Sequence, residues 1–334
     1  MKGDDLFRRR RAIEMRTPRE TRFYPHTPMG EGAEFDAIRR MLERWGPHAR
    51  RIGDDAGVIT TLGDRALVVS TDSSVENIHF RADWLSPQEI GYRAAAAALS
   101  DLAAMGAKPI GMLAALTIPE SWREHLDAIT DGIGDAASFS GAPIIGGDMS
   151  RGSELALTFT VLGTTRNALY RTAVRPGDKV YVTGRLGGSF AALQDLQAGR
   201  PPSTQDRERF ARPVPRIRES LWLAEHGASS AIDISDGLSA DLMHLASASR
   251  VAITIDLGAL LTVEGVPAIE AAGSGEEYEL VVTTPSTFDT EVFQQRFGLE
   301  LTEIGQVAQG NPDVKFLLDG VEVAAPPGYS HFTG

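Results

Sequence analysis

The chain has 334 residues, a formal net charge of −12 and no cysteine. The missing cysteines exclude disulfides, thiolate zinc sites, iron–sulfur clusters and a cysteine nucleophile. The acidic charge argues against general nucleic-acid binding, which needs a basic surface, and no stretch approaches the roughly 18–20 apolar residues of a membrane span. No apolar region follows the N-terminal arginines as in a signal peptide. We therefore expect a cytoplasmic protein that binds neither nucleic acid nor membrane.

At this length two domains are expected, and a polar segment precedes them. Residues 1–28 are rich in arginine and interrupted by proline, which predicts a flexible N-terminal extension; a polyanion-binding arm is the alternative. Apolar residues then recur at helical spacing over residues 34–45 and over the alanine-rich residues 87–105. The other elements predicted in this half are strands at 66–70, 109–116, 143–148 and 155–163 and a helix at 122–140.

A connection near residues 165–172 separates the two halves of the chain, and we place domains at residues 29–168 and 169–334. In the second half helices and strands alternate, which predicts an α/β or α+β protein with mixed sheets and flanking helices. The strands expected there lie at 179–183, 231–234, 251–255, 278–283 and 302–307, and the helices at 189–196, 216–226, 238–249 and 288–297.

Acidic residues gather in short clusters flanked by Gly or Ser, several of which follow strand-like stretches. The clusters are Gly53-Asp54-Asp55-Ala56, Ser70-Thr71-Asp72-Ser73, Ser100-Asp101-Leu102, Gly146-Gly147-Asp148 and Asp233-Ile234-Ser235-Asp236-Gly237. Carboxylates brought together repel and raise each other's pKa, a cost that divalent cations relieve. Mg²⁺ is the usual cation where phosphates supply the other ligands. The clusters therefore predict a Mg²⁺-dependent enzyme that handles phosphates.

Each cluster alone also has a structural interpretation. The alternatives are a surface turn for Asp54 and Asp55, a helix cap or Asx turn for Thr71 and Asp72, and a helix cap for Ser235 or Asp236. The strand at 66–70 is expected to be buried and to close at Thr71–Asp72. The strand at 143–148 is expected to end in a Gly-Gly-Asp turn.

Three further residues have two interpretations each. His79 is either a half-buried strand histidine or a substrate contact. Glu276 belongs either to a solvated acidic loop or to a binding loop, and Arg171 is either a solvated linker charge or a clamp for a nucleotide phosphate. No Gly-Lys dipeptide occurs, so a Walker A loop is excluded, and protein-kinase and serine-hydrolase motifs are also missing. A bound nucleotide would thus depend on carboxylate-held Mg²⁺.

These motifs together resemble the thiamine-monophosphate kinase family, in the superfamily that includes aminoimidazole ribonucleotide synthetase. The resemblance extends from about residue 30 to the end of the chain. The matching segments are Ile52 to Ala56, Val69 to Asp72, Asn77 to Phe80, Leu99 to Ala107, Ile145 to Asp148, Arg175 to Asp178, Ala231 to Leu238, Gly275 to Leu280 and Gly328 to Phe332. It implies the two-domain aminoimidazole-ribonucleotide-synthetase-like fold, a homodimer, and a transferase that uses ATP to phosphorylate thiamine monophosphate to thiamine diphosphate.

The resemblance also implies roles by position. Mg²⁺ ligands are expected at Asp55, Ser70, Thr71, Asp72, Asp101, Asp148, Asp233 and Asp236. ATP contacts are expected at Gly147, Asp148, Arg171 and Ser235, and substrate contacts at His79, Glu276 and Tyr329. The substrate phosphate attacks ATP directly, so no general base is expected, and the metals at Asp72, Asp101 and Asp148 assist the transfer.

One position departs from the family pattern, because Glu277 stands where an aspartate is usual. Two alternatives to the kinase are kept. The first is another ATP-dependent synthetase of the superfamily, against which His79 and the terminal Gly-Tyr-x-His-Phe weigh. The second is a non-catalytic regulator that binds Mg²⁺ and nucleotide, against which the apparently complete carboxylate set weighs.

Overall fold

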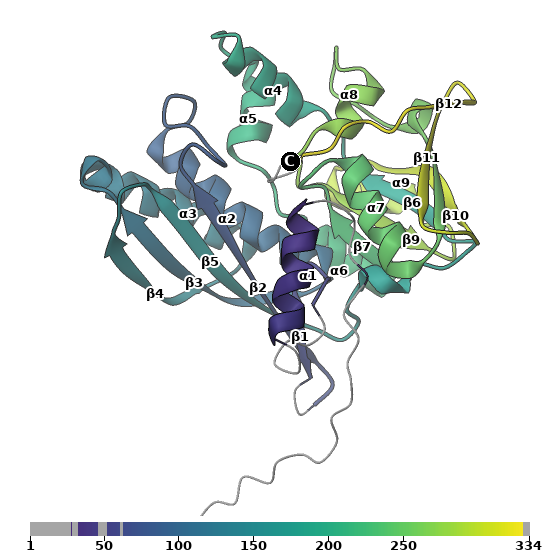
Figure 1. Cartoon of the computed structure of the whole chain (residues 1–334), viewed down its shortest axis with the longest axis horizontal. Coiled ribbons are helices and arrows are strands. Elements are labelled where there is room, and N and C mark those ends of the chain that lie inside the picture. Colours follow the sequence, from purple (N-terminus) through teal and green to yellow (C-terminus); the bar gives the residue numbers. More distant parts are fainter. Residues whose placement is uncertain (1–27, 29–32, 46–51, 61–62, 330–334) are drawn as a thin grey trace, which may run out of the picture.

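The structure, a computed structural model, describes residues 28, 33–45, 52–60 and 63–329. Its first half forms a five-stranded mixed sheet in the order β1-β2-β5-β3-β4 (Figure 1). The strands are β1 (Gly57–Thr60), β2 (Ala66–Val75), β3 (Lys108–Ile118), β4 (Ile144–Arg151) and β5 (Ala156–Thr165). β3 and β4 run parallel and the other neighbours antiparallel.

The second half forms a seven-stranded mixed sheet in the order β12-β11-β8-β10-β6-β9-β7. The strands are β6 (Lys179–Thr183), β7 (Ser230–Asp233), β8 (Ala252–Asp256), β9 (Leu280–Thr284), β10 (Leu301–Ala308), β11 (Asp313–Leu318) and β12 (Val321–Val323). Residues 166–178 connect the two sheets, and the predicted domain boundary at 168/169 falls in this connection and stays a prediction.

The helices pack around these two sheets. They are α1 (Ala33–Trp45), α2 (Pro87–Ala104), α3 (Leu126–Ser140), α4 (Gly188–Gln197), α5 (Thr204–Ala211), α6 (Ile217–Glu225), α7 (Leu238–Ser249), α8 (Ala268–Gly273) and α9 (Thr290–Phe297), with 3-10 turns at Glu120–His125, Arg171–Ala173 and Leu257–Ala259. Among the described residues, no helix is both long and apolar enough to cross a membrane.

Helix α2 joins the two halves of the molecule. It starts at a capping box of Ser86 and Glu89 with Pro87 in its first turn. One side packs on β2 and β5, and another side contacts α6 and β7 (Figure 1). Its crossing with α3 is so close that a Cβ atom at Gly91 would lie 2.1 Å from the carbonyl oxygen of Ile129. A side chain larger than hydrogen therefore cannot be placed there without moving the two helices apart.

Two hydrophobic cores follow from this packing. One core is continuous through both halves and includes Leu99 of α2, Phe159 of β5 and Leu223 of α6. The second core lies between α7 and the seven-stranded sheet and includes Leu242 and Ile253. Because α2 belongs to the first core, its polar residues are held at the junction of the two halves.

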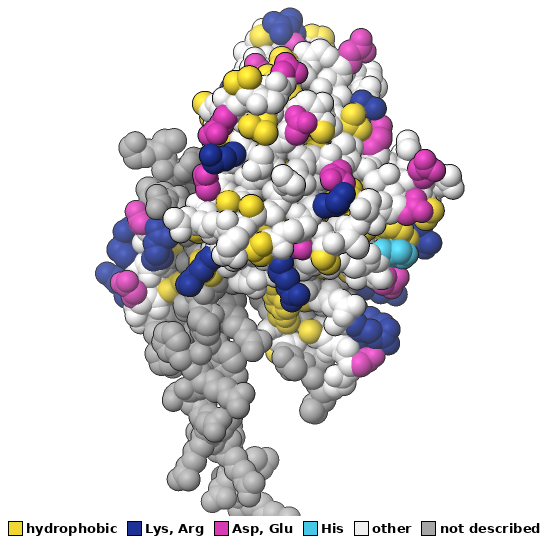
Figure 2. Space-filling view, turned by 90° about the vertical axis from the view of Figure 1, so that its right-hand side faces the viewer, with side chains coloured by type: hydrophobic (Ala, Val, Ile, Leu, Met, Phe, Trp, Pro, Cys, Tyr) yellow, Lys and Arg dark blue, Asp and Glu magenta, His cyan; other side chains and the backbone are white. Residues whose placement is uncertain are grey.

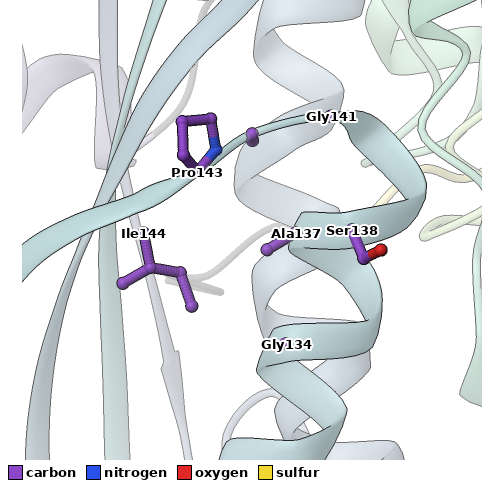
Figure 3. A pocket seen from close by; sticks show the side chains of 7 residues that line it. Gly134, Ala137, Ser138, Gly141, Pro143 and Ile144 are labelled. Carbon is purple, nitrogen blue, oxygen red and sulfur yellow. The ribbon is translucent and has the colours of Figure 1, made fainter.

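The five-stranded sheet keeps large apolar side chains exposed. Those exposed by more than a third are Ile59, Ile110, Leu113, Ile144, Ile145 and Met149. Near the start of β4 a shallow pocket of about 380 Å³ is lined by residues of α3, of β4 and of the segment between them, among them Ala137, Pro143 and Ile144 (Figure 3). On the face of the molecule seen in Figure 2, acidic and basic side chains are interspersed.

Most predicted elements are present, and three expectations were wrong. The strand at 66–70 neither is buried nor closes at Asp72: only Val68 is buried, and β2 continues to Val75 because β5 pairs with it throughout. The Gly-Gly-Asp segment is not a turn, since β4 pairs with β3 as far as Arg151. The single helix predicted at 122–140 is instead a 3-10 turn at Glu120–His125 followed by α3 at Leu126–Ser140. The elements not predicted are β1, α5, α8, β11 and β12.

Candidate active site

Three carboxylates from distant parts of the chain meet at the junction of the two halves. Asp55 precedes β1, Asp101 lies in the last turns of α2, and Asp233 ends β7; their oxygens lie within 4.8 Å of one another. Two serine hydroxyls hold them: Ser70 donates to Asp101 at 2.5 Å and Ser100 donates to Asp233 at 2.5 Å. We call Asp55, Asp101 and Asp233 the carboxylate cluster.

Burial dominates the electrostatics of this cluster. It raises the pKa of Asp233 to about 7, and the nearby charge of Asp55 acts in the same direction. Burial also raises the pKa of Asp101 well above its usual range, with further contributions from Asp233, Asp55 and Asp72. Burial and mutual repulsion therefore disfavour the ionised forms of these carboxyl groups, a cost that a bound cation would relieve.

Arg171 forms an ion pair with the carboxylate cluster through Asp55. Its Nε lies 2.9 Å and its Nη2 2.5 Å from the two carboxylate oxygens of Asp55, a bidentate ion pair. Its backbone N–H donates to Asp54 at 2.8 Å. Asp55 and Arg171 side chains are 2% and 19% exposed, so neither the surface-turn interpretation of Asp55 nor the solvated-linker interpretation of Arg171 holds.

The residues of β2 divide between the two faces of the sheet. Side chains alternate along a strand, so Ser70 and Asp72 share one face and Thr71 points to the other. Ser70 contacts the carboxylate cluster, and the charge of Asp72 acts on Asp101. The hydroxyl of Thr71 donates to the carbonyl oxygen of Phe159 at 3.1 Å. The structure thus brings Ser70 and Asp72 to the cluster but not the side chain of Thr71.

Gly147 and Asp148 lie apart from the cluster within this chain. They belong to β4, which β5 and β3 separate from β2. The register aligns Asp72, Phe159, Ala114 and Gly147 across these four strands. Asp72 and Gly147 are thus three strand spacings apart, which corresponds to about 14 Å. Asp148 is exposed, and a Cβ at Gly147 would lie 1.9 Å from the carbonyl oxygen of Ala114, so only glycine fits there.

A second group of possible ligands lies at the start of α7. Asp236, Asp241 and His244 also have ligand atoms within 4.8 Å of one another. The N-cap of α7 is Gly237, so neither Ser235 nor Asp236 caps this helix as the structural alternative required. His244 was missed by the sequence analysis, although the spacing Asp-x₂-His on one helical face was a usable signal. We call these three residues the α7 cluster.

His79 follows β2 in a tight turn. Its Nδ1 accepts a hydrogen bond from the backbone N–H of Val75 at 3.1 Å. In the neutral ring the proton is therefore on Nε2, which makes that nitrogen the donor. The half-buried ring is thus oriented by the backbone rather than packed as an ordinary strand residue.

Glu276 lies in the loop of residues 274–279, between α8 and β9. Its φ of 57° is in the left-handed region, and its N–H donates to the carbonyl oxygen of Ser235 at 2.7 Å. Its carboxylate lies 2.5 Å from Nη2 of the buried Arg93. The N–H of Tyr329 donates to the carbonyl oxygen of Asp236 at 2.9 Å. The loop and the C-terminal segment therefore meet at residues 235–236.

Glu277, the departure from the family pattern, supports α4. Its Oε1 accepts from the N–H groups of Gly187 and Ser189, at 3.0 and 3.1 Å, and from the hydroxyl of Ser274 at 2.6 Å. Burial raises the pKa of Glu277 to about 7. A carboxylate at the N-terminus of a helix satisfies free N–H groups there. The side chain thus ties the loop of residues 274–279 to α4.

Comparisons with known proteins agree on one family. Models of AIR synthase related proteins match this chain, the N-terminal domain at residues 53–165 and the C-terminal domain at residues 175–316. The thiamine-monophosphate kinase of Salmonella typhimurium is 36% identical over 325 residues, which cover 90% of this chain and 98% of the relative. That of Bacillus subtilis is 32% identical over 323 residues, which cover 90% and 99%.

A solved structure described as AaThiL complexed with AMPPCP and TMP has a TM-score of 0.78 and 29% identity, and covers 90% of this chain and 97% of its own. The predicted fold class, with two mixed sheets and flanking helices, is confirmed. The chain belongs to the thiamine-monophosphate kinase family.

Proposed function

We propose that this protein uses ATP to phosphorylate thiamine monophosphate to thiamine diphosphate, as a homodimer in the cytoplasm, and so serves thiamine diphosphate biosynthesis. The observation that carries the proposal is the buried carboxylate cluster beside Arg171 in a chain of this family. The solved relative described with AMPPCP and TMP supports an ATP site and a thiamine monophosphate site here.

The carboxylate cluster fits Mg²⁺ by its donor chemistry. Asp55, Asp101, Asp233 and the hydroxyl of Ser70 offer only oxygen atoms, which hard cations prefer. When bound there, Mg²⁺ supplies neutralising charge and alignment for two phosphate groups. At the cluster the proposed ligands are Asp55, Ser70, Asp72, Asp101 and Asp233. Asp148 and Asp236, which lie outside the cluster, are proposed as ligands of further Mg²⁺ ions, and the hydroxyl of Thr71, which points to the other face of the sheet, does not reach the cluster.

The residues around the cluster have distinct proposed tasks. The terminal phosphate of thiamine monophosphate is ionised near neutral pH, so it attacks in line without a general base. Arg171 binds a nucleotide phosphate with the fork that now holds Asp55. Nε2–H of His79 donates to the substrate. Ser235, Gly147 and Asp148 are the remaining proposed ATP contacts, and Glu276 and Tyr329 the remaining substrate contacts.

The homodimer is supported by the exposed apolar side chains of the five-stranded sheet. Exposed apolar patches mark interaction surfaces, and a second copy packed there would bury Leu113, Ile145 and Met149. It would also cover β4, which carries Asp148. Sedimentation velocity of the full chain, compared with that of Ile145→Asp, tests this part of the proposal: a monomeric wild-type chain contradicts it.

A turnover assay with ATP, thiamine monophosphate and Mg²⁺ tests the reaction, with the product identified by mass. Thiamine diphosphate that forms only with a divalent cation supports the proposal. ATP binding without any thiamine diphosphate contradicts the substrate assignment. Asp64→Asn is a suitable control, because Asp64 pairs with Arg166 in an exposed ion pair outside the site.

A further inference from the structure

We propose that Glu279 is a positioning residue for thiamine monophosphate: it holds the loop of residues 274–279 in the conformation that presents Glu276 to the substrate. The inference rests on the proposed function, in which Glu276 contacts thiamine monophosphate. None of the roles implied by the family resemblance falls on Glu279, although the residue lies in a matching segment. Glu279 acts through Glu276 and not by direct contact, since it is only 1% exposed.

The carboxylate of Glu279 is engaged on both oxygens. Its Oε2 accepts from the hydroxyl of Thr183 at 2.6 Å and from Nε of Arg216 at 2.8 Å, and Nη2 of Arg216 donates to Oε1. The side chains of Glu279 and Arg216 are 2% and 14% exposed, so this bidentate ion pair is buried. Such a pair is held firmly, because an unpaired charge in the interior is costly. We call Thr183, Arg216 and Glu279 the Glu279 network.

The Glu279 network joins three elements that border the loop. Thr183 ends β6, and its hydroxyl oxygen also accepts from the N–H of Leu280 in β9 at 2.9 Å. Arg216 is the N-cap residue of α6. A Cβ atom at Gly184 would lie 2.5 Å from Oε1 of Glu279, so a glycine at this position, with its φ of 65°, leaves the space that the carboxylate fills. The end of the loop is therefore fixed against β6 and the start of α6.

The backbone conformation of the loop needs this support. Glu276 and Tyr278 have φ values of 57° and 53°, in the left-handed region that is unfavourable for residues with a side chain. Their N–H groups donate to the carbonyl oxygens of Ser235 and Ile234, at 2.7 and 2.9 Å. The N–H of Ile234 in turn donates to the carbonyl oxygen of Glu279 at 2.8 Å. The two left-handed residues are thus held by these backbone hydrogen bonds and by the Glu279 network at the end of the loop.

Loss of this support should affect Glu276 more than the carboxylate cluster. Asp233 is paired with Leu280 in the ladder of β7 and β9, which holds it independently of the loop. Glu276 lies outside that ladder and depends on the loop conformation. A disturbed Glu279 network should therefore weaken binding of thiamine monophosphate and leave ATP binding and the transfer step nearly unchanged.

Steady-state kinetics of Glu279→Gln, which keeps the size of the side chain and removes its charge, tests the inference. We expect KM for thiamine monophosphate to rise about tenfold, with kcat and KM for ATP nearly unchanged. Calorimetric titration with thiamine monophosphate should show a similar loss of affinity. Arg216→Lys keeps the positive charge but not the bidentate fork, so it should show a smaller loss than Arg216→Met.

A double-mutant cycle with Glu276→Ala distinguishes positioning from general support of the fold. If Glu279 acts through Glu276, Glu279→Gln should have little further effect on KM once the Glu276 side chain is removed. Glu303→Gln is the matched control, because it also breaks an ion pair, with Lys179, but Glu303 is exposed and lies outside the Glu279 network. Circular dichroism shows which variants are folded, and Arg216→Lys replaces Glu279→Gln in the cycle if that variant is not.

The inference is overturned if folded Glu279→Gln binds thiamine monophosphate as the wild type does, or if its effect and that of Glu276→Ala add fully. A fall in kcat at unchanged KM also overturns it. A wild-type chain that neither binds nor phosphorylates thiamine monophosphate contradicts the proposed function, whereas unchanged binding by Glu279→Gln beside an active wild type contradicts only the positioning role of Glu279.

Discussion

The carboxylate cluster and the α7 cluster hold similar groups but are built in different ways. The first joins a bend, a helix and a strand end that lie 46 to 178 residues apart in the chain, and serine hydroxyls and Arg171 hold it. The second lies within nine consecutive residues of one loop and helix. The first therefore depends on how α2 packs between the sheets, and the second mainly on helix geometry.

Removal of Arg171 should break the carboxylate cluster most severely. Arg171→Met leaves the buried carboxylate of Asp55 without its ion-pair partner. We expect a loss of about 3–5 kcal/mol in the free energy of unfolding, as when one partner of a buried pair is removed. Chemical denaturation measures this loss, and added Mg²⁺ should restore more stability to the variant than to the wild type. An equal effect of Mg²⁺ on both proteins would contradict this role of Arg171.

Neutralising Asp101 should separate activity from stability in the same cluster. In Asp101→Asn we expect turnover to fall by about 100- to 1000-fold, the scale seen when one electrostatic contact to a transition state is lost. Stability should stay the same or rise, because the repulsion between Asp101 and Asp233 is removed. Steady-state kinetics and thermal unfolding test the two halves of this prediction. Normal turnover in the folded variant would remove Asp101 from the metal site.

The attachment of the loop of residues 274–279 to α4 should depend on pH through Glu277. Its pKa is about 7 in the folded protein and near 4.5 in the unfolded chain. Folding therefore favours the protonated form. The stability contribution of Glu277 is fully present below pH 4.5 and is lost as the pH rises through 7. Denaturation of Glu277→Gln between pH 4.5 and 8 should show a shallower fall than the wild type; parallel curves would refute the prediction.

The smallest expected effect concerns Arg93, which positions Glu276 in the loop of residues 274–279. Arg93 is buried and forms an ion pair with Glu276. The guanidinium carbon of Arg93 lies 4.3 Å from the centre of the Phe210 ring. Arg93→Met should raise KM for thiamine monophosphate about tenfold, or about 1.4 kcal/mol, with little change in kcat. Arg93→Lys should recover part of this loss. A fall in kcat at unchanged KM would show that Arg93 acts elsewhere.

The sequence predicted helices and strands well where apolar periodicity was strong. Helix α7 and strand β6 have the predicted bounds, and α2 differs by one residue at its end. The prediction from sequence failed where pairing with a neighbouring strand lengthened an element. Strands β2 and β4 continue through polar residues because β5 and β3 supply their hydrogen bonds. The roles assigned to the site residues stay predictions, as does everything expected of residues 1–27 and 330–334, which lie outside the described residues.

The sequence by itself determined the family, the fold class and the types of side chain available for chemistry, because local periodicity and short motifs carry that information. Only the tertiary structure decided which side chains meet. It placed Asp55, Asp101 and Asp233 together, paired Arg171 with Asp55, and left Asp148 on β4, which two strands separate from β2. It also revealed His244 beside Asp241. These contacts between side chains depend on the packing of α2 and on the order of the strands. Both are determined by contacts between residues that are distant in the sequence.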